Sequence, residues 1–377
     1  MLCDPPYGLS FMGKAWDHGV PGPEVWSLVL RALKPGAHLL AFGGTRTFHR
    51  LTCAIEDAGF EIRDCLSWLY GSGFPKSKAL REVGADWQGY GTSIKPSWEP
   101  CIVAMKPPAG TFAQNALAHG VAGLNVDGCR IGNRKGWPAS ESTFRGFAKS
   151  GESVPTEPRG VGRWPANVVL SHHEDCRRVV ATLTSREWDH ETGGPVQTVD
   201  PAERWECVEG CAVRMLDEQS GESYSSNNGS LVTGQNTRCR GEFGPRRQFG
   251  YEDRGGASRF FYCAKASRSE REAGLREAGL TSDGYGSIQR DFTPNKIRNH
   301  HPTVKPLDLC EWLARLILPP KRDTPRRLLV PFSGSGSEMI GSLRAGWDEV
   351  VGIEREPAYV AISEARLRHE TRQAIIA

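Results

Sequence analysis

A carboxylate, two prolines and an aromatic ring follow one another near the start of the sequence, at Asp4, Pro5, Pro6 and Tyr7. The prolines have a fixed φ and no N–H, so they form a stiff turn at the end of a strand. A carboxylate and a backbone carbonyl held there can accept two N–H bonds from an exocyclic amine, and a ring can stack on the base that carries it. The motif therefore suits a site that holds a nucleobase amine.

A second stretch with chemical potential lies far downstream, in VPFSGSGSE. Gly334 and Gly336 stand between a predicted strand and a predicted helix, where glycine lets the backbone approach a ligand closely. The next strand ends in Glu354, eighteen residues after Gly336, and an acid at this place can accept both hydroxyls of a ribose. A structural turn is the alternative for the glycines alone. Together, strand, glycines, helix, strand and acid predict an adenosine-containing cofactor.

A third group combines histidine and cysteine, in SHHEDC and WECVEGC. The pairs His173-x2-Cys176 and Cys207-x3-Cys211 have ligand-like spacings, and four such groups can close a tetrahedral zinc site. The prediction is one structural zinc on His173 (or His172), Cys176, Cys207 and Cys211. Free surface or core thiols are the alternative. A zinc site would stabilise a loop-rich segment that has little core.

Alternating helix and strand patterns surround the first two motifs. The apolar spacing predicts helices at 23–36, 50–59, 306–320, 337–346 and 357–370, and strands at 37–44, 60–71, 101–107, 327–332 and 349–354. Strands that alternate with helices favour a mostly parallel sheet covered on both faces. The predicted fold class is therefore α/β, with a doubly wound sheet.

Between about Gly110 and Asn299 this alternation fades and turn residues increase, which predicts an inserted, loop-rich region. Within it, the segment 236–268 has eight Arg or Lys residues and three acids, which indicates either a basic face or a solvated loop. The whole chain of 377 residues has a net charge of only +3, a weak indication of a polyanionic partner.

The remaining composition bounds the cellular setting. Eleven scattered cysteines are an odd number and imply no disulfide framework, which fits a reducing cytoplasm. The chain opens with no secretory leader pattern, and no apolar run approaches the ~20 residues that span a bilayer. We therefore expect a cytoplasmic protein without a membrane partner.

The ordered motifs resemble those of a known family. Asp-Pro-Pro-Tyr with a separate Phe-x-Gly-x-Gly is similar to the DNA amino-methyltransferases, which use S-adenosylmethionine. A catalytic motif that precedes the cofactor motif resembles the beta class, a circularly permuted branch that includes many bacterial and phage adenine methyltransferases. HPTVKP at 301–306 resembles the segment that contacts the methionine part of the cofactor, and GGASRFFYCAKASRSERE resembles phage-type members. The resemblance covers essentially the whole chain.

This resemblance implies a Rossmann-like class I methyltransferase fold with three regions. Residues 1–108 would form the catalytic half, 109–298 an inserted target-recognition region, and 299–377 the cofactor-binding half. The implied reaction is site-specific transfer of a methyl group from S-adenosylmethionine to N6 of adenine in double-stranded DNA. The transfer would be direct and in line, on a base flipped out of the duplex. The implied setting is DNA methylation, including restriction–modification, in a bacterial or phage-infected cell.

The resemblance also implies roles for individual residues. Asp4 and the Pro5 carbonyl would bind the target amine, Pro6 would complete the motif, and Tyr7 would stack on the base. The adenosine of the cofactor would be held by Phe332, Gly334, Gly336 and Glu354. Its carboxylate end would be reached by Thr303 and Lys305.

Two cytosine alternatives follow from other features. Cytosine ring-carbon methyltransferases use a Pro-Cys nucleophile, and Pro100-Cys101 has this sequence, but Cys101 opens an apolar strand and is interpreted as a core cysteine. Cytosine-N4 enzymes of the resembled family mostly have Ser in place of Asp, so Asp4 favours adenine. The oligomeric state is left open, with a homodimer among the options.

The short segment before Asp4 leads to a separate expectation. Only Met1, Leu2 and Cys3 precede the motif, whereas a strand runs about five residues and members of the resembled family have some tens of residues more. The sequence therefore predicts an N-terminally shortened form in which backbone groups near Asp4 lack partners. Such a chain would be less active and less stable than an upstream-extended one, and a DNA-binding remnant with impaired catalysis is the limiting case.

Overall fold

The computed structural model describes the chain except for residues 11–16, 72, 74–76, 133–161, 190–193, 225–229, 236–241, 249–253, 265–267, 276, 279, 281–298, 300, 302–303 and 377. At 180–189, 194–204, 224, 230–235, 242–248, 268–269 and 373–376 it describes the backbone alone.

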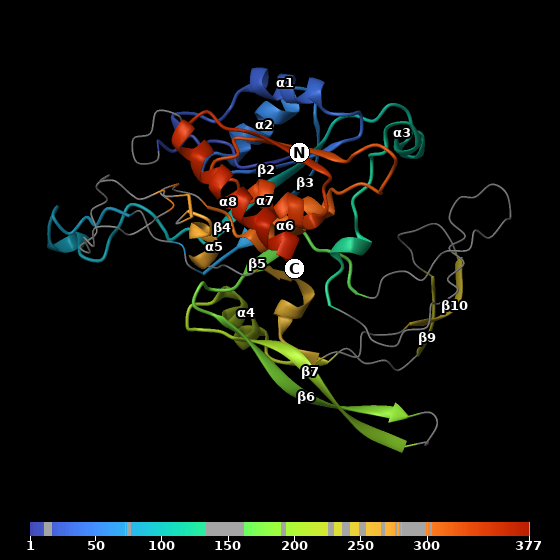
Figure 1. Cartoon of the computed structure of the whole chain (residues 1–377). Coiled ribbons are helices and arrows are strands. Elements are labelled where there is room, and N and C mark those ends of the chain that lie inside the picture. The colour runs from blue at the N-terminus through green and yellow to red at the C-terminus, as the bar shows by residue number, and fades with distance from the viewer. Residues whose placement is uncertain are drawn as a thin grey trace.

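A mostly parallel sheet forms the centre of the molecule (Figure 1). Its hydrogen-bonded order is β1 (Leu2–Cys3), β2 (His38–Phe42), β4 (Trp98–Met105), β3 (Glu61–Leu69), β5 (Val168–Ser171) and β12 (Tyr262–Ala264). Within it, β4 runs antiparallel to both of its neighbours, and the other pairs are parallel. A further parallel pair, β13 (Arg327–Pro331) and β14 (Glu349–Ile353), lies against β1 through β13. The predicted α/β fold class is confirmed.

Helices cover both faces of this sheet. Two of them, α1 (Pro23–Ala32) and α2 (Phe48–Asp57), pack on the face that contains Leu39 and Ala41. On the opposite face, which contains Leu40 and Phe42, lie α6 (Leu307–Leu316) and α7 (Ser337–Ala345), with α8 (Pro357–Ile376) against α7. Because side chains alternate along a strand, one short run of apolar residues in β2 supplies both cores. None of the described helices combines the length and the apolarity needed to cross a membrane.

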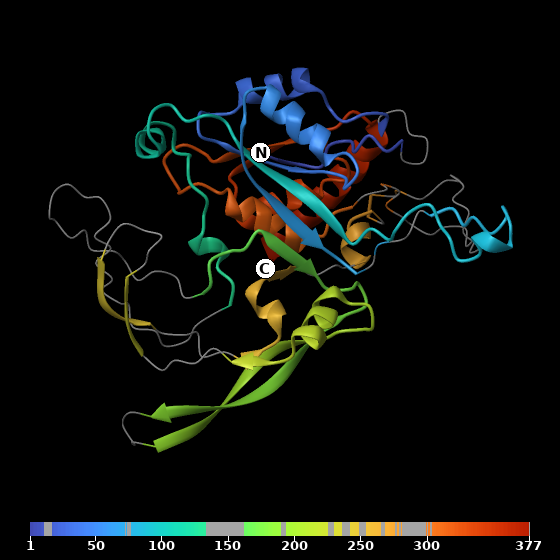
Figure 2. The ribbon, with the colours of Figure 1, turned by 180° about the vertical axis from the view of Figure 1, so that it is seen from behind.

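The region predicted as an insert contributes directly to the sheet, because β5 and β12 extend it beyond β3. Its other elements are α3 (Phe112–His119), β6 (Arg177–Asp189), β7 (Gly194–Glu206), α4 (Ala212–Ser220), β8 (Ser223–Tyr224), β9 (Ser230–Gln235), β10 (Glu242–Gln248), β11 (Arg254–Gly255) and α5 (Arg268–Glu272). Strands β6 and β7 form a long antiparallel hairpin that projects away from the sheet (Figures 1 and 2).

The strand before Asp4 is short but well integrated. Leu2 and Cys3 pair in parallel with Leu40 and Ala41, and the Met1 amine donates to the His38 carbonyl at 2.9 Å. All three residues before Asp4 are buried. The expectation that backbone groups near Asp4 lack partners is therefore wrong on the β2 side, since Leu2 and Cys3 pair with β2 there.

Burial of His38 predicts a pH-dependent stability. Burial, helped by the nearby Met1 amine, lowers the pKa of His38 from 6.5 to about 4. The unfolded chain then binds a proton that the folded chain does not, so stability falls as the pH drops through this interval. The effect is on the order of 3 kcal/mol, at about 1.4 kcal/mol per pKa unit. Unfolding curves of His38→Gln should depend less on pH than those of the wild type. The exposed His49→Gln is the control, and equal slopes in all three proteins would contradict the assignment.

Candidate active site

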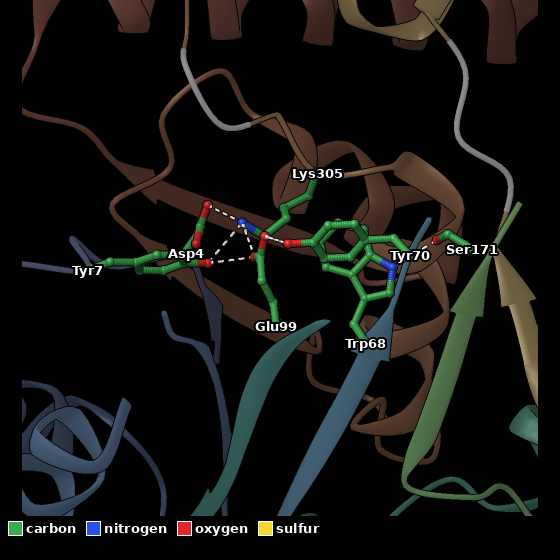
Figure 3. A network of polar contacts seen from close by, with 7 residues as sticks. All are labelled: Asp4, Tyr7, Trp68, Tyr70, Glu99, Ser171 and Lys305. Atoms are coloured by element: carbon green, nitrogen blue, oxygen red, sulfur yellow. Dashed lines mark hydrogen bonds and ion pairs between the residues drawn. The ribbon is translucent and has the colours of Figure 1, made fainter. Parts of the chain in front are cut away.

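Asp4 lies directly after β1 and is held by a lysine from the far end of the chain. The Lys305 ammonium donates to Asp4 Oδ2 at 2.6 Å and to the Tyr7 hydroxyl at 3.1 Å (Figure 3). The side chains of Lys305 and Asp4 are only 3% and 10% exposed. The second carboxylate oxygen, Asp4 Oδ1, is buried and accepts no hydrogen bond within the described part of the chain. One oxygen is thus fixed, and the other is available as an acceptor.

A second carboxylate, Glu99 at the start of β4, completes this network. The hydroxyls of Tyr7 and Tyr70 donate to its two oxygens at 2.9 and 3.2 Å, and Lys305 Nζ lies 3.4 Å from Oε2 (Figure 3). The ammonium also lies 4.7 Å from the centre of the Phe42 ring, a cation–π distance. The lysine is therefore enclosed by two carboxylates and an aromatic face.

The charges of this network follow from its neighbours. Burial alone would favour a neutral Lys305, but the Asp4 and Glu99 carboxylates outweigh it and raise the pKa of the amine above its ordinary value. Burial and the same two carboxylates raise the pKa of Tyr7 well above its ordinary value. At neutral pH the network therefore contains an ammonium and an un-ionised phenol, and both can donate hydrogen bonds.

A cleft of about 1840 Å³ opens beside Asp4. Its lining includes Asp4, Pro5, Pro6 and Tyr7 from the first motif, and Phe332, Ile353, Glu354 and Tyr359 from the second. A single small ligand occupies a pocket of roughly 300–1,000 Å³. The cleft is therefore large enough for two ligands side by side, one at each motif.

The glycine turn after β13 has the tight geometry that its sequence predicts. Gly334 and Gly336 have φ of 49° and 81°, and a Cβ added to Gly334 would lie 2.5 Å from His301 Nε2. The Gly334 and Glu356 amides donate to the two oxygens of Glu354 at 2.8 and 2.9 Å. Each oxygen of a carboxylate can accept two hydrogen bonds. Glu354 is thus fixed by the turn and keeps acceptor capacity for the two hydroxyls of a ribose.

Two of the residues predicted to bind the cofactor, Thr303 and Lys305, are not seen beside the glycine turn. Thr303 lies outside the described residues. Lys305 does not reach toward the glycine turn, because its ammonium is buried between Asp4 and Glu99. The expected contact of Lys305 with the cofactor carboxylate stays a prediction, and in the structure its ammonium contacts Asp4 and Glu99.

Sequence reasoning missed Glu99 and Tyr70. Glu99 stands in WEPCIVAM, at the start of a buried strand. A charged residue there needs a partner, and this requirement could have indicated its role.

The nearby Cys101 is 1% exposed, and burial raises the pKa of its thiol. A protonated thiol in the core is a poor nucleophile, so its interpretation as a core cysteine is confirmed.

The predicted cysteine ligands come together in the structure, but with His172 in place of His173. His172, not His173, lies beside the cysteines, and its Nδ1 is 3.3 Å from Cys207 Sγ. Cys176 and Cys211 complete the cluster. The ring of His173 instead accepts a hydrogen bond from the Asp175 amide at 3.2 Å. The first choice of histidine was wrong, because spacing alone does not show which of two adjacent side chains faces the cysteines.

Strand β3 connects β5, in the region predicted as an insert, to the network around Lys305. The Trp68 indole donates to the Ser171 hydroxyl at 2.8 Å, and the Trp68 and Tyr70 ring centres lie 4.9 Å apart (Figure 3). Ser171 is the last residue of β5. A continuous series of contacts therefore runs from β5 through two aromatic side chains to Glu99.

Comparison with known proteins gives the following relatives. No protein-family model matches the chain. The chain is 30% identical over 115 residues to the type II methyltransferase M.HindIII of Haemophilus influenzae. Among solved structures it is similar to the M1.HpyAVI–SAM complex (TM-score 0.36, 11% identity, 97% of this chain and 86% of that one). It is also similar to the cytosine-N4-specific PvuII DNA methyltransferase (TM-score 0.40, 10% identity, 97% and 78%). The match to M.HindIII covers 27% of this chain and 37% of that relative.

Proposed function

We propose that the chain transfers a methyl group from S-adenosylmethionine to an exocyclic amine of a DNA base. The observation that carries this proposal is the buried Asp4 Oδ1, which accepts no hydrogen bond from the described residues although Asp4 lines the cleft. Leaving a buried acceptor unsatisfied costs about 1–3 kcal/mol. An amine N–H of a bound base would supply the missing donor.

The residues of the chain would act mainly by positioning. Asp4 Oδ1 and the Pro5 carbonyl would accept the two N–H groups of the amine, which leaves its lone pair directed to the methyl group. Lys305 fixes Asp4 through Oδ2. The Tyr7 ring lines the cleft and would stack on the base. When bound, S-adenosylmethionine supplies the electrophilic methyl group. Orientation of the two reactants would provide most of the rate enhancement, and no covalent nucleophile is required.

The second motif fits the adenosine part of this cofactor. Glu354 is fixed by two backbone amides and would accept the ribose hydroxyls with its remaining lone pairs. Phe332 and Tyr359 line the cleft beside it and offer apolar surface to the adenine ring. The Gly334 turn would allow close approach of the backbone.

Glu354→Gln is expected to weaken binding of S-adenosylmethionine. The amide keeps one acceptor oxygen, and its NH₂ group can accept neither from a ribose hydroxyl nor from the Gly334 or Glu356 amide that it would face. A hydrogen bond to a charged group contributes about 1.5–3 kcal/mol, which corresponds to a roughly 10–100-fold loss of affinity. Calorimetric titration measures it. Glu349→Gln, at the exposed end of the same strand, should bind like the wild type. Unchanged affinity in Glu354→Gln would contradict the ribose assignment.

The proposed base is adenine in duplex DNA, because the first motif has Asp4 where cytosine-N4 enzymes of the resembled family mostly have Ser. Cytosine N4 is the second candidate. A base inside a duplex cannot reach the methyl group, so the mechanism requires base flipping. Residues 109–298 would recognise the target sequence between the catalytic half at 1–108 and the cofactor half at 299–377.

Analysis of the methylated product tests the proposal. Duplex DNA of mixed sequence is incubated with the protein and S-adenosylmethionine, digested to nucleosides and examined by mass spectrometry. The expected product is N6-methyl-2′-deoxyadenosine. N4-methylcytosine would correct the base but keep the mechanism, whereas a ring-carbon product would overturn it. No product from protein that binds the cofactor and DNA would favour the impaired DNA-binding remnant.

A further inference from the structure

Four potential metal ligands converge at the base of the long hairpin. The ligand atoms of His172, Cys176, Cys207 and Cys211 all lie within 4.8 Å of one another. His172 Nδ1 is 3.3 Å from Cys207 Sγ and 3.8 Å from Cys211 Sγ. A tetrahedron with bonds of about 2.0–2.3 Å to nitrogen and sulfur has edges of roughly 3.5–3.8 Å. The observed spacing is close to that of a coordinated set.

The chemistry of the donors selects the metal. Three thiolates and one imidazole are soft or borderline ligands, which favour zinc over magnesium or calcium. Four protein ligands leave no open position, so the site is of the structural kind and not of the catalytic kind. His172, Cys176 and Cys211 are at most 7% exposed, so the bound ion is shielded from solvent.

The position of each ligand shows what the ion would join. His172 follows β5 directly, and its amide donates to the Ala264 carbonyl of β12 at 3.0 Å. Cys176 precedes β6 and Cys207 follows β7, so they flank the last residue pair of the hairpin. Cys211 is the N-cap of α4. The four ligands thus come from the end of β5, both strands of the hairpin and a helix.

The hairpin needs such an anchor. Its thirteen residue pairs give it a length of roughly 40 Å at about 3.3 Å per residue, and it projects from the body (Figure 2). An isolated two-stranded hairpin is at best marginally stable in water. Beneath it lies a small apolar cluster whose fully buried members are Leu170, Cys176, Cys211 and Val213. Strand β7 of the hairpin also contains Trp205, whose ring stacks on that of His172 with the ring centres 4.0 Å apart.

We propose that His172, Cys176, Cys207 and Cys211 bind one structural Zn²⁺ that holds the β6–β7 hairpin and α4 to the end of β5 in the central sheet. Metal binding would contribute directly to the folding of this region, which has little core of its own. The inference does not depend on the reaction, because the metal content and the anchoring of the hairpin can be measured without it.

Metal analysis of the purified, reduced protein tests the site. We expect one zinc per chain by elemental analysis, and a Co²⁺-substituted protein with the absorption of tetrahedral thiolate coordination. Cys207→Ser and His172→Ala should lose the metal, whereas His172→Cys, which restores a fourth ligand, should retain it. His173→Ala and the exposed Cys53→Ser are matched controls and should keep a full complement.

A wild-type measurement decides the outcome even if the ligand variants do not fold. Removal of zinc with a strong chelator should expose the hairpin to limited proteolysis and lower the melting temperature. Added zinc should restore both, and magnesium should not. The proposal is overturned if metal-free wild-type protein keeps its protease resistance and melting temperature. It is also overturned if the metal is lost equally from the His173 and His172 variants, or if Cys207 and Cys211 form a disulfide in the native protein.

Discussion

Asp4→Ala is expected to abolish methyl transfer while cofactor binding stays close to that of the wild type. The substitution removes the buried oxygen that would accept the amine N–H. Cofactor binding should be little affected, because Asp4 belongs to the first motif of the cleft and Glu354 to the second. Misplacement of a reacting group by about 1 Å can cost a hundredfold in rate. Loss of the orienting acceptor should cost at least that much. Single-turnover transfer from labelled S-adenosylmethionine measures the rate, and calorimetry measures the affinity.

Asp4→Asn refines this test, because it preserves the shape of the side chain and removes its charge. It should also be strongly impaired, since its amide cannot accept from both Lys305 and the substrate amine. Asp64→Asn, on the exposed part of β3, is the control and should transfer at the wild-type rate. Full activity of Asp4→Ala would show that the proposed mechanism is wrong.

Lys305→Met is expected to be strongly destabilising as well as inactive. It leaves the buried Asp4 carboxylate, and the nearby Glu99, without the ammonium that neutralises them. Removing one partner of a buried ion pair costs about 3–5 kcal/mol, because the remaining charge stays in a low-dielectric environment. Denaturant unfolding should show this loss at neutral pH.

The double variant Lys305→Met with Asp4→Asn separates stability from catalysis. It should recover much of the stability and none of the activity. The Asp4 charge is gone and Glu99 keeps its hydrogen bonds from Tyr7 and Tyr70, but the acceptor is not restored. Lys34→Met, whose ammonium lies at the surface, is the control for the loss of a lysine. If Lys305→Met is as stable as the wild type, the charge network does not hold Asp4 in place.

The local elements could be predicted because their signals are local. The helix predicted at 306–320 is observed at Leu307–Leu316, and the strand predicted at 37–44 is observed at His38–Phe42. Proline and glycine at their ends, and the apolar spacing within them, act over a few residues. The turn at Gly334 was predictable for the same reason, since its glycines and Glu354 belong to consecutive elements.

The remaining features depend on contacts between distant segments. Nothing in the pattern of β5 indicates that it pairs with β3, because its partner lies about a hundred residues away. Glu99 acquires its role only when Lys305 is placed against it. For the zinc ligands, the spacing predicted a cluster, but the choice between His172 and His173 required the direction of each side chain at the end of a strand.

The contact between Asp4 and Lys305 has a consequence for how the protein is made. Asp4 and Lys305 are separated by 301 positions in the sequence, and at about 5–20 residues per second a ribosome needs roughly 15–60 s to synthesise the interval. During that time the face of β2 that contains Leu40 and Phe42 has no α6 or α7 to cover it. The nascent chain therefore exposes an apolar sheet face until α6 and α7 have been synthesised. A lower growth temperature or additional chaperone should raise the yield of active protein more than a stronger promoter does.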